Sequence, residues 1–473
     1  MKKVLLWLII GLLSLSIMGP ISLVGCTKAT VETAAATTAA ETTTAATTAA
    51  VTLTESDEFN AWLADTYKNY SGTEIKVAVA SHPAIEALKA MTPQFEEKTG
   101  IKVVWDEMEE GILLDKFLVD ATSGKSSYDV VMMCPEFTPT VVDLNLLTPL
   151  DDWFADKEKT PDWVAVDDIL PAYRNMLYMN DHFWGLPFCG ETIFMLYRKD
   201  IFDKYDLKVP TTFDELLETA KFINENVPDM AGISMRTRRG WEATYMWSVF
   251  IFPFGGKIID FDANKPALDQ KETIDSLKYF VELCKYGPVG IETFSYPESF
   301  DAFMQGKAGI MVEASFAASE AENPDKSIVA GKVGWAPMPT GPAGAFSGAW
   351  GWGLSLVDAS EKKDAAWAFI TYMTGKPMQS EYIANGGVVS RTSWLEDPKN
   401  QEEFPYYQAI IDTIKQATNL QTTGYGVVIM DPAWGPLSEM IGTEVSRAVT
   451  GEITVEEAAK NMQEQAVEIW ESR

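Results

Sequence analysis

The sequence is poor in the residues that metal and nucleophile chemistry need. Its 473 residues include two histidines and four cysteines. There is no CxxC pair, and no HExxH, GxSxG or glycine-lysine phosphate-loop motif occurs. A histidine-rich zinc site is therefore excluded, and the standard hydrolase and nucleotide chemistries find no motif to use. The sequence implies no metal and no other cofactor.

Positive charge is also scarce. Lys and Arg number 38 against 68 Asp and Glu, which gives a formal net charge of −30. So acidic a surface repels phosphate backbones, and nucleic acid is not an expected partner. Cys134, Cys189 and Cys284 are far apart and odd in number, so the sequence leaves their redox state open.

One long apolar run exists, and it lies at the start. Residues 4–19 follow Lys2 and Lys3, and they are too few for a span of about 20 residues. This pattern predicts a secretory signal peptide at 1–25, with an uncleaved anchor helix as the alternative. Residues 23–26, "LVGC", resemble a bacterial lipobox, which implies cleavage before Cys26 and a lipid on its sulfur.

The segment 26–54 continues from that cysteine into a tract of Ala and Thr. Between residues 29 and 52 there is no Leu, Ile or aromatic residue. Such a tract buries too little apolar surface to offset its ordering entropy, and its β-branched Thr weaken the alternative of an Ala-rich helix. We therefore predict a disordered tether that holds an extracytoplasmic domain at the cell membrane.

The folded part begins with alternating strands and helices. We expect strands at 75–81, 101–108 and 128–134, with helices at 85–98 and 112–124 between them. This alternation predicts βαβ units and a mostly parallel sheet, whose ligands bind beyond the carboxyl ends of the strands. Those ends carry Ser81 with His82, Glu109 with Glu110, and residues 134–137.

Three later helices have recognisable starts. Thr212 with Glu215 and Thr454 with Glu457 form the capping-box pattern. Ser360 is expected to cap a helix over 361–374, which Gly375 would end.

Several segments, in this order, resemble one family. They include "WGLPFCGETIFMLYRKDIFDKY", "FMQGKAGIMVEASF", "GAWGWGLSLVDASEKKDAAWAFITYMTG" and "NGGVVSRTSW". Together with "YDLKVPTTFDELLETAKFI" they resemble the extracellular solute-binding lipoproteins of carbohydrate ABC importers, the maltose-binding type. "GISMRTRRGWEATYMW" and "KYGPVG" look like the branch that takes up sugar alcohols.

The resemblance implies an α/β fold of two lobes, the periplasmic-binding-protein-like fold with hinge-linked parallel and mixed sheets. The N-lobe would be 72–187 plus 340–388, and the C-lobe 191–337 plus 392–473. The lobes would close on a sugar or polyol by hinge motion, and the closed form would dock on ABC permease subunits. We expect a monomer without enzymatic activity.

A sugar site needs carboxylates and Arg for hydroxyl edges and aromatic rings for C–H faces. Strand ends and family positions together predict these ligand contacts: His82, Glu110, Glu136, Phe137, Glu191, Arg236, Trp241, Glu313, Phe316, Trp350, Trp352, Arg391 and Trp434. About half of them are expected to touch ligand. Glu110 could instead be a helix-dipole charge and Arg391 a hinge support. Trp350 and Trp352 are expected on opposite faces of one strand, with one of them in the core.

Two other functions stay open from the residues alone. A surface glycosidase or polysaccharide lyase would also use acids and aromatics, and it would release products from oligosaccharides. An adhesin or scaffold would have no small-ligand cleft.

Overall fold

The computed structural model describes residues 57–418 and 429–473. The predicted signal peptide, Cys26 and the tether lie outside the described residues. Within the described ranges, no helix is long and apolar enough to cross a membrane.

The first strands and helices form the predicted βαβ units. Strand β1 (Glu74–Ala80) pairs in parallel with β2 (Lys102–Met108) and with β3 (Val130–Met133). Helices α2 (Pro83–Thr99) and α3 (Glu110–Ala121) connect them. The apolar runs of β1 and β3 are buried, as a sheet covered on both faces requires. Each of these five elements lies within about three residues of its predicted position.

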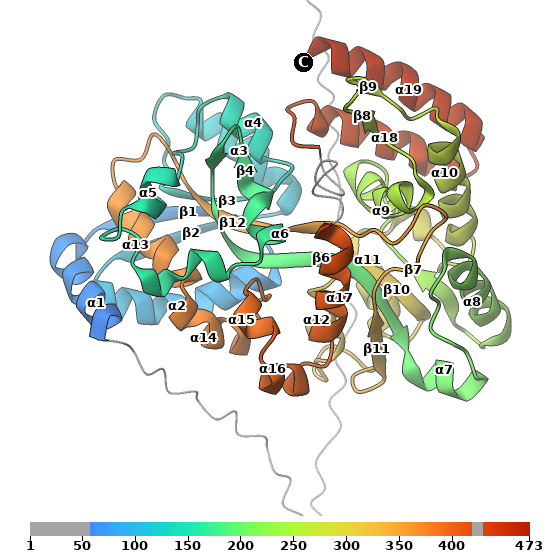
Figure 1. Cartoon of the computed structure of the whole chain (residues 1–473), viewed down its shortest axis with the longest axis horizontal. Helices are drawn as coiled ribbons and strands as arrows, with labels where there is room; N and C mark the ends of the chain where they lie inside the picture. Colours follow the sequence, from blue (N-terminus) through green and yellow to red (C-terminus); the bar gives the residue numbers. More distant parts are fainter. Residues whose placement is uncertain (1–56, 419–428) are drawn as a thin grey trace, which may run out of the picture. The chain divides into compact units, whose positions relative to one another are not determined.

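One long strand belongs to two parts of the sheet. The first residues of β6 (Leu186–Arg198) pair antiparallel with β12 (Ala349–Leu356), which also pairs with β3. The later residues of β6 pair with β10 (Ala308–Ala314) and β11 (Val333–Ala336). The order is β2-β1-β3-β12-β6-β10-β7, with β7 (Ala231–Ser234) parallel to β10. Figure 1 shows β6 running through the middle of the molecule and ending beside α7.

The close pairing of β6 and β12 depends on glycine. Gly351 has φ +154°, and a Cβ there would lie 2.1 Å from the carbonyl oxygen of Cys189. Only a residue without a side chain allows the two strands to approach in this way. This approach brings the residues around Cys189 and Trp350 together in the middle of the sheet.

Helices cover both parts of the sheet. On the first part lie α1 (Asp57–Tyr70), α4 (Thr138–Asp143), α5 (Asp151–Ala155), α6 (Pro171–Arg174), α13 (Lys363–Thr374), α14 (Gln379–Ala384) and α15 (Thr392–Leu395). The other helices are α7 (Lys199–Tyr205), α8 (Phe213–Asn226), α9 (Trp241–Ile251), α10 (Lys271–Cys284), α11 (Tyr296–Met304), α12 (Ala317–Ala321), α16 (Pro398–Glu403), α17 (Tyr407–Thr418), α18 (Trp434–Val449) and α19 (Val455–Ser472). Two short hairpins pair β4 (Tyr178–Met179) with β5 (His182–Phe183) and β8 (Ile259–Asp260) with β9 (Lys265–Pro266).

Two of the three predicted helix starts are confirmed. The capping boxes of Thr212 and Thr454 are both complete, and they open α8 and α19. The prediction for Ser360 is wrong, because α13 begins at Lys363. The Ser360 hydroxyl accepts from the backbone N–H of Lys362 at 3.0 Å and donates to the carboxylate of Asp129 at 2.7 Å. Asp129 is almost fully buried, and a buried carboxylate needs such donors.

The three cysteines in the described residues are buried free thiols. Burial raises the pKa of Cys134, Cys189 and Cys284. All three are therefore protonated at neutral pH, and the fold is held by its apolar core.

Candidate functional site

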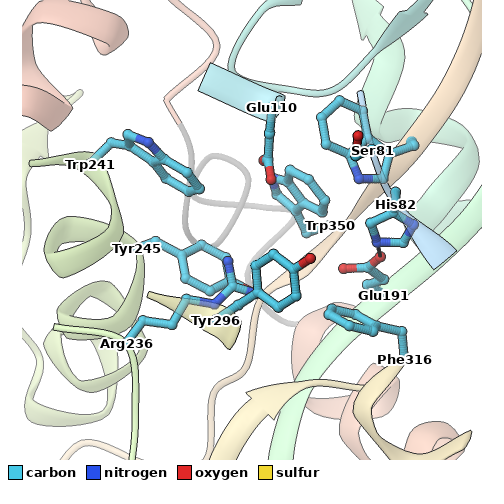
Figure 2. A pocket seen from close by; sticks show the side chains of 11 residues that line it. Ser81, His82, Glu110, Glu191, Arg236, Trp241, Tyr245, Tyr296, Phe316 and Trp350 are labelled. Carbon is cyan, nitrogen blue, oxygen red and sulfur yellow. Dashed lines mark ion pairs between the residues drawn. The ribbon is translucent and has the colours of Figure 1, made fainter. Parts of the chain in front are cut away.

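A pocket lies where strand ends from both parts of the sheet meet. It is lined by Ser81, His82, Glu110, Glu191, Arg236, Trp241, Tyr245, Tyr296, Phe316, Trp350 and Trp352. The space among them measures about 380 Å³, including the part open to solvent. Figure 2 shows these side chains converging from opposite sides of the space.

His82 follows β1 and caps α2. The backbone N–H of Ala84 donates to its Nδ1 at 3.1 Å, so this nitrogen carries a lone pair and the ring is neutral. The proton therefore lies on Nε2, which is 3.2 Å from the carboxylate of Glu191. The capping bond thus fixes both the tautomer of His82 and its donor toward Glu191.

Glu191 lies at the centre of β6 and is 2% exposed. It also accepts a hydrogen bond from the thiol of Cys189 at 3.1 Å. The side-chain atoms of His82, Cys189 and Glu191 that could ligate a metal lie within 4.8 Å of one another. However, the Cys189 thiol keeps its proton and donates to Glu191, and the Nε2 of His82 carries the ring proton, so neither atom is in the form that ligates a metal.

Arg236 follows β7 and forms a two-bond pair with Glu313 of β10. Its Nε and Nη2 donate to the two carboxylate oxygens at 2.8 and 2.7 Å. Arg236 is 6% exposed and Glu313 is fully buried. Burial would lower the pKa of Arg236, but the charge and hydrogen bonds of Glu313 more than offset it and raise the pKa. The guanidinium also lies over the rings of Tyr245 and Tyr296, at 4.9 and 5.4 Å.

Two indole rings form one wall of the pocket. The centroids of Trp350 and Trp352 are 4.9 Å apart, and the rings are nearly perpendicular. The prediction that they point to opposite faces is wrong, because residues two apart on a strand share a face and both line the pocket. The Nε1 of Trp350 donates to both oxygens of Glu136, at 2.8 and 2.7 Å. Glu136 therefore lies behind the wall and holds the Trp350 ring.

Eight of the thirteen predicted contacts line the pocket: His82, Glu110, Glu191, Arg236, Trp241, Phe316, Trp350 and Trp352. Glu136, Phe137 and Glu313 lie one layer behind it. Phe137 packs its ring against Trp352 with centroids 5.9 Å apart.

The remaining two predicted contacts do not line the pocket. Arg391 donates to the backbone carbonyls of Val164, Ala165 and Thr374 at 2.7–2.8 Å. Trp434 is the buried first residue of α18.

Sequence reasoning missed three lining residues: Ser81, Tyr245 and Tyr296. Ser81 stands at a strand end that the pattern had identified. Tyr245 lies four residues after Trp241 on α9, and this spacing places both on one helix face. Tyr296 begins α11, and no strand-end or spacing signal marks it.

Burial shifts several carboxyl groups toward the protonated form. It is the largest cause of the raised pKa of Glu110, while the nearby charge of Arg236 lowers that pKa. Burial also raises the pKa of Glu136 to about 7 and that of Glu242 to about 7. Glu110, Glu136 and Glu242 thus hold a proton more readily than ordinary carboxyl groups.

Comparisons with known proteins agree with this geometry. The sequence model of the family described as bacterial extracellular solute-binding proteins matches residues 79–380. A probable amino-acid ABC transporter periplasmic-binding protein of Sinorhizobium fredii is 28% identical over 413 residues, which cover 84% of this chain and 89% of that protein.

Two solved structures superpose over most of the chain. The solute-binding protein of Agrobacterium radiobacter K84 in complex with ribitol has a TM-score of 0.78 and 26% identity, covering 85% of this chain and 99% of that one. The protein of Agrobacterium vitis S4 with bound D-mannitol has a TM-score of 0.76 and 28% identity, with the same coverage. The predicted two-lobe α/β fold is confirmed, and the chain belongs to the bacterial extracellular solute-binding protein family.

Proposed function

We propose that the pocket captures a sugar alcohol or a small sugar and that the protein delivers it to an ABC-type permease. The observation that carries this is the pairing of an aromatic wall with hydroxyl-binding groups. Trp350 and Trp352 offer flat apolar surface for C–H faces, while Glu110, Glu191 and Arg236 offer acceptors and donors for hydroxyls. The ribitol and D-mannitol complexes of the two similar structures support a polyol as the cargo.

The geometry favours a polyol over an amino acid, although the similar Sinorhizobium fredii protein is named for amino-acid transport. An α-carboxylate needs a free cation. Among the described residues, the one arginine that lines the pocket already makes two bonds to Glu313. A carboxylate would instead meet Glu110 and Glu191, and like charges in a buried site repel strongly.

A binding role without catalysis follows from the same contacts. The two similar structures are described as binding proteins. A glycosidase needs one carboxyl as acid and a second as base or nucleophile. Here Glu191 accepts from Cys189 and lies 3.2 Å from the Nε2 of His82, and Glu313 is bound to Arg236. Incubation with oligosaccharides should release no products, and any turnover lost in the Glu191→Gln variant would contradict this.

The two lobes would close around the ligand, with the N-lobe at 72–187 plus 340–388 and the C-lobe at 191–337 plus 392–473. The pairing of β6 with strands of both sheet parts supports a crossing near Thr192 and Ile193. The pocket is lined from both sides of this crossing, so closure would exclude water from it. Small-angle scattering with and without ligand should show a compaction on binding.

The chain would act as a monomer on the outer face of the cell membrane, held by a lipid on Cys26. The lipobox and the Ala- and Thr-rich segment support this anchoring. The Cys26→Ala variant should move from the membrane fraction to the soluble extracytoplasmic fraction. A variant that stays with the membrane would point to the uncleaved anchor helix instead.

The experiment for the central proposal is a melting-temperature screen of the purified protein. Ribitol, D-mannitol, D-glucitol, monosaccharides, short oligosaccharides and amino acids should be compared. A ligand at 100 times its Kd adds about 2.7 kcal/mol to the free energy of unfolding. We expect a shift with a polyol or a small sugar, whereas a shift only with amino acids would overturn the proposal.

A further inference from the structure

We propose that the pocket prefers a sugar or sugar alcohol that carries a positively charged amino group over the neutral and the anionic forms of the same skeleton. This inference rests on the proposed function and names the charge class of its cargo. It depends on which carboxylates around the pocket have a cationic partner in the described residues and which have none.

The one arginine that lines the pocket is already neutralised. Arg236 gives two hydrogen bonds to Glu313, and both side chains are at least nine-tenths buried. A two-bond pair of this kind leaves little net charge for a ligand. Arg236 is therefore not available to balance the negative charge of the other carboxylates of the pocket.

Glu191 has donors but no positive charge beside it. The thiol of Cys189 is protonated, and the ring of His82 is neutral because its Nδ1 accepts the Ala84 N–H. The thiol donates to Glu191, and the Nε2 of His82 lies 3.2 Å from the same carboxylate. The Glu191 carboxylate thus has a hydrogen-bond donor but no positive counter-charge, and its side chain is only 2% exposed.

Glu110 is the second unbalanced carboxyl. No hydrogen bond or ion pair from the described residues reaches it, and Figure 2 shows its side chain directed into the pocket. Burial is the largest cause of its raised pKa, and the nearby charge of Arg236 acts against it, so a cation beside Glu110 would favour its ionised form. Behind the wall, Glu136 adds a further acid.

An ammonium group fits this arrangement. It offers three donors and a positive charge, and charge-assisted hydrogen bonds are roughly twice as strong as neutral ones. The faces of Trp241 and Trp350, which line the same space, also attract a cation. An alkyl ammonium stays protonated at neutral pH, as lysine does. A carboxylate at the same place would face Glu110 and Glu191 without a free arginine.

A matched ligand series tests the proposal. D-Glucitol, 1-amino-1-deoxy-D-glucitol and D-gluconate share one skeleton and differ only at C1, and the corresponding D-mannitol series repeats the comparison. Titration calorimetry of the purified protein at pH 7 should give a Kd about tenfold or more lower for the amino compound than for the neutral one. The anion should bind at least about tenfold more weakly than the neutral compound.

Variants locate the effect in the pocket. Glu110→Gln should reduce the affinity ratio of amino to neutral ligand toward one. Glu468→Gln removes the same charge from the exposed face of α19 and should leave the ratio unchanged. If Glu468→Gln lowers the ratio equally, the preference comes from the overall charge of −30 and the inference is overturned.

The remaining outcomes separate this inference from the proposed function. Neutral polyols that bind as tightly as their amino forms overturn the inference and leave the polyol function intact. If no member of either series binds and no other sugar does, the proposed function itself fails. The wild-type ratio decides the matter even where Glu110→Gln does not fold.

Discussion

The buried pair of Arg236 and Glu313 supports the sharpest stability prediction. In Glu313→Gln, the side chain keeps its size but loses its charge. The amide oxygen can accept one of the two guanidinium bonds, while the amide nitrogen faces the second donor. The variant also weakens the bond from the Ala314 N–H, which now reaches a carboxylate oxygen at 2.8 Å. Arg236 would remain as a buried cation without a counter-charge.

The size of the effect follows from that burial. Removing one partner of a buried ion pair costs about 3–5 kcal/mol of unfolding free energy. The entropy of unfolding is about 2.1 cal/mol/K per residue, so about 400 ordered residues change by close to 0.85 kcal/mol per kelvin. The melting temperature of Glu313→Gln should therefore fall by about 4–6 °C.

The assay is calorimetric unfolding of the wild type and two matched variants. Glu282→Gln removes the partner of Lys285 from an exposed pair with 2.6 Å between the charged atoms, and it should cost less than about 1 kcal/mol. The double variant Arg236→Met with Glu313→Leu removes both buried charges, so it should be more stable than Glu313→Gln. The reasoning would be refuted if Glu313→Gln and Glu282→Gln lost the same free energy of unfolding. It would also be refuted if the loss in the double variant were the sum of the losses from its two single substitutions.

Three further predictions concern single side chains. Burial raises the pKa of Glu136 to about 7 from a usual value of 4.5, so its protonated form contributes stability that is lost as the pH rises through 7. Glu136→Gln should thus gain about 3 kcal/mol relative to the wild type between pH 4 and 8 in urea titrations, and a difference independent of pH would contradict this. Arg391→Met removes three hydrogen bonds to backbone carbonyls and should lower the unfolding free energy by about 2–4 kcal/mol. Its polyol Kd should stay within about twofold of the wild type, because Arg391 does not line the pocket, and a tenfold loss would place it in the site. Thr454→Ala breaks the capping box of α19 and should cost about 1 kcal/mol in the same titrations, whereas no loss would mean that water caps this helix equally well.

Short sequence patterns correctly predicted the strands and helix starts that depend on neighbouring residues. The strands around Val77 and Val131 are continuous apolar runs in a sheet buried on both faces, and the capping boxes are complete within four residues. The start of α13 was not predictable in this way. The Ser360 hydroxyl accepts from the Lys362 N–H just before the helix and donates to Asp129, which is 231 residues away in sequence.

The pocket residues were likewise predictable only where a local pattern marks them. Strand ends predicted His82 and Glu110, because the carboxyl ends of parallel strands meet at one edge of a sheet, and the family positions added Arg236. The spacing from Trp241 to Tyr245 would also have identified Tyr245. Tyr296 was not predictable, since it enters the pocket from the start of α11 only through tertiary packing.

Glu136 and Arg391 were predicted as ligand contacts, but their polar groups bind other parts of the protein. Both have the chemistry of a sugar contact, and sequence cannot tell whether a polar head reaches the ligand or another protein group. In the structure, the Glu136 carboxylate binds the Trp350 indole and the Arg391 guanidinium binds backbone carbonyls. The lobe boundaries stay a prediction until a closure experiment is done.

The most direct test of the account is titration calorimetry with ribitol and D-mannitol on the wild type, Trp350→Ala and Trp62→Ala. Trp350 lines the pocket, while Trp62 lies on α1 away from it. We predict one-site binding that Trp350→Ala weakens about tenfold or more and that Trp62→Ala leaves unchanged. Binding that survives in Trp350→Ala with wild-type affinity, or no binding of any polyol or sugar by the wild type, would contradict it.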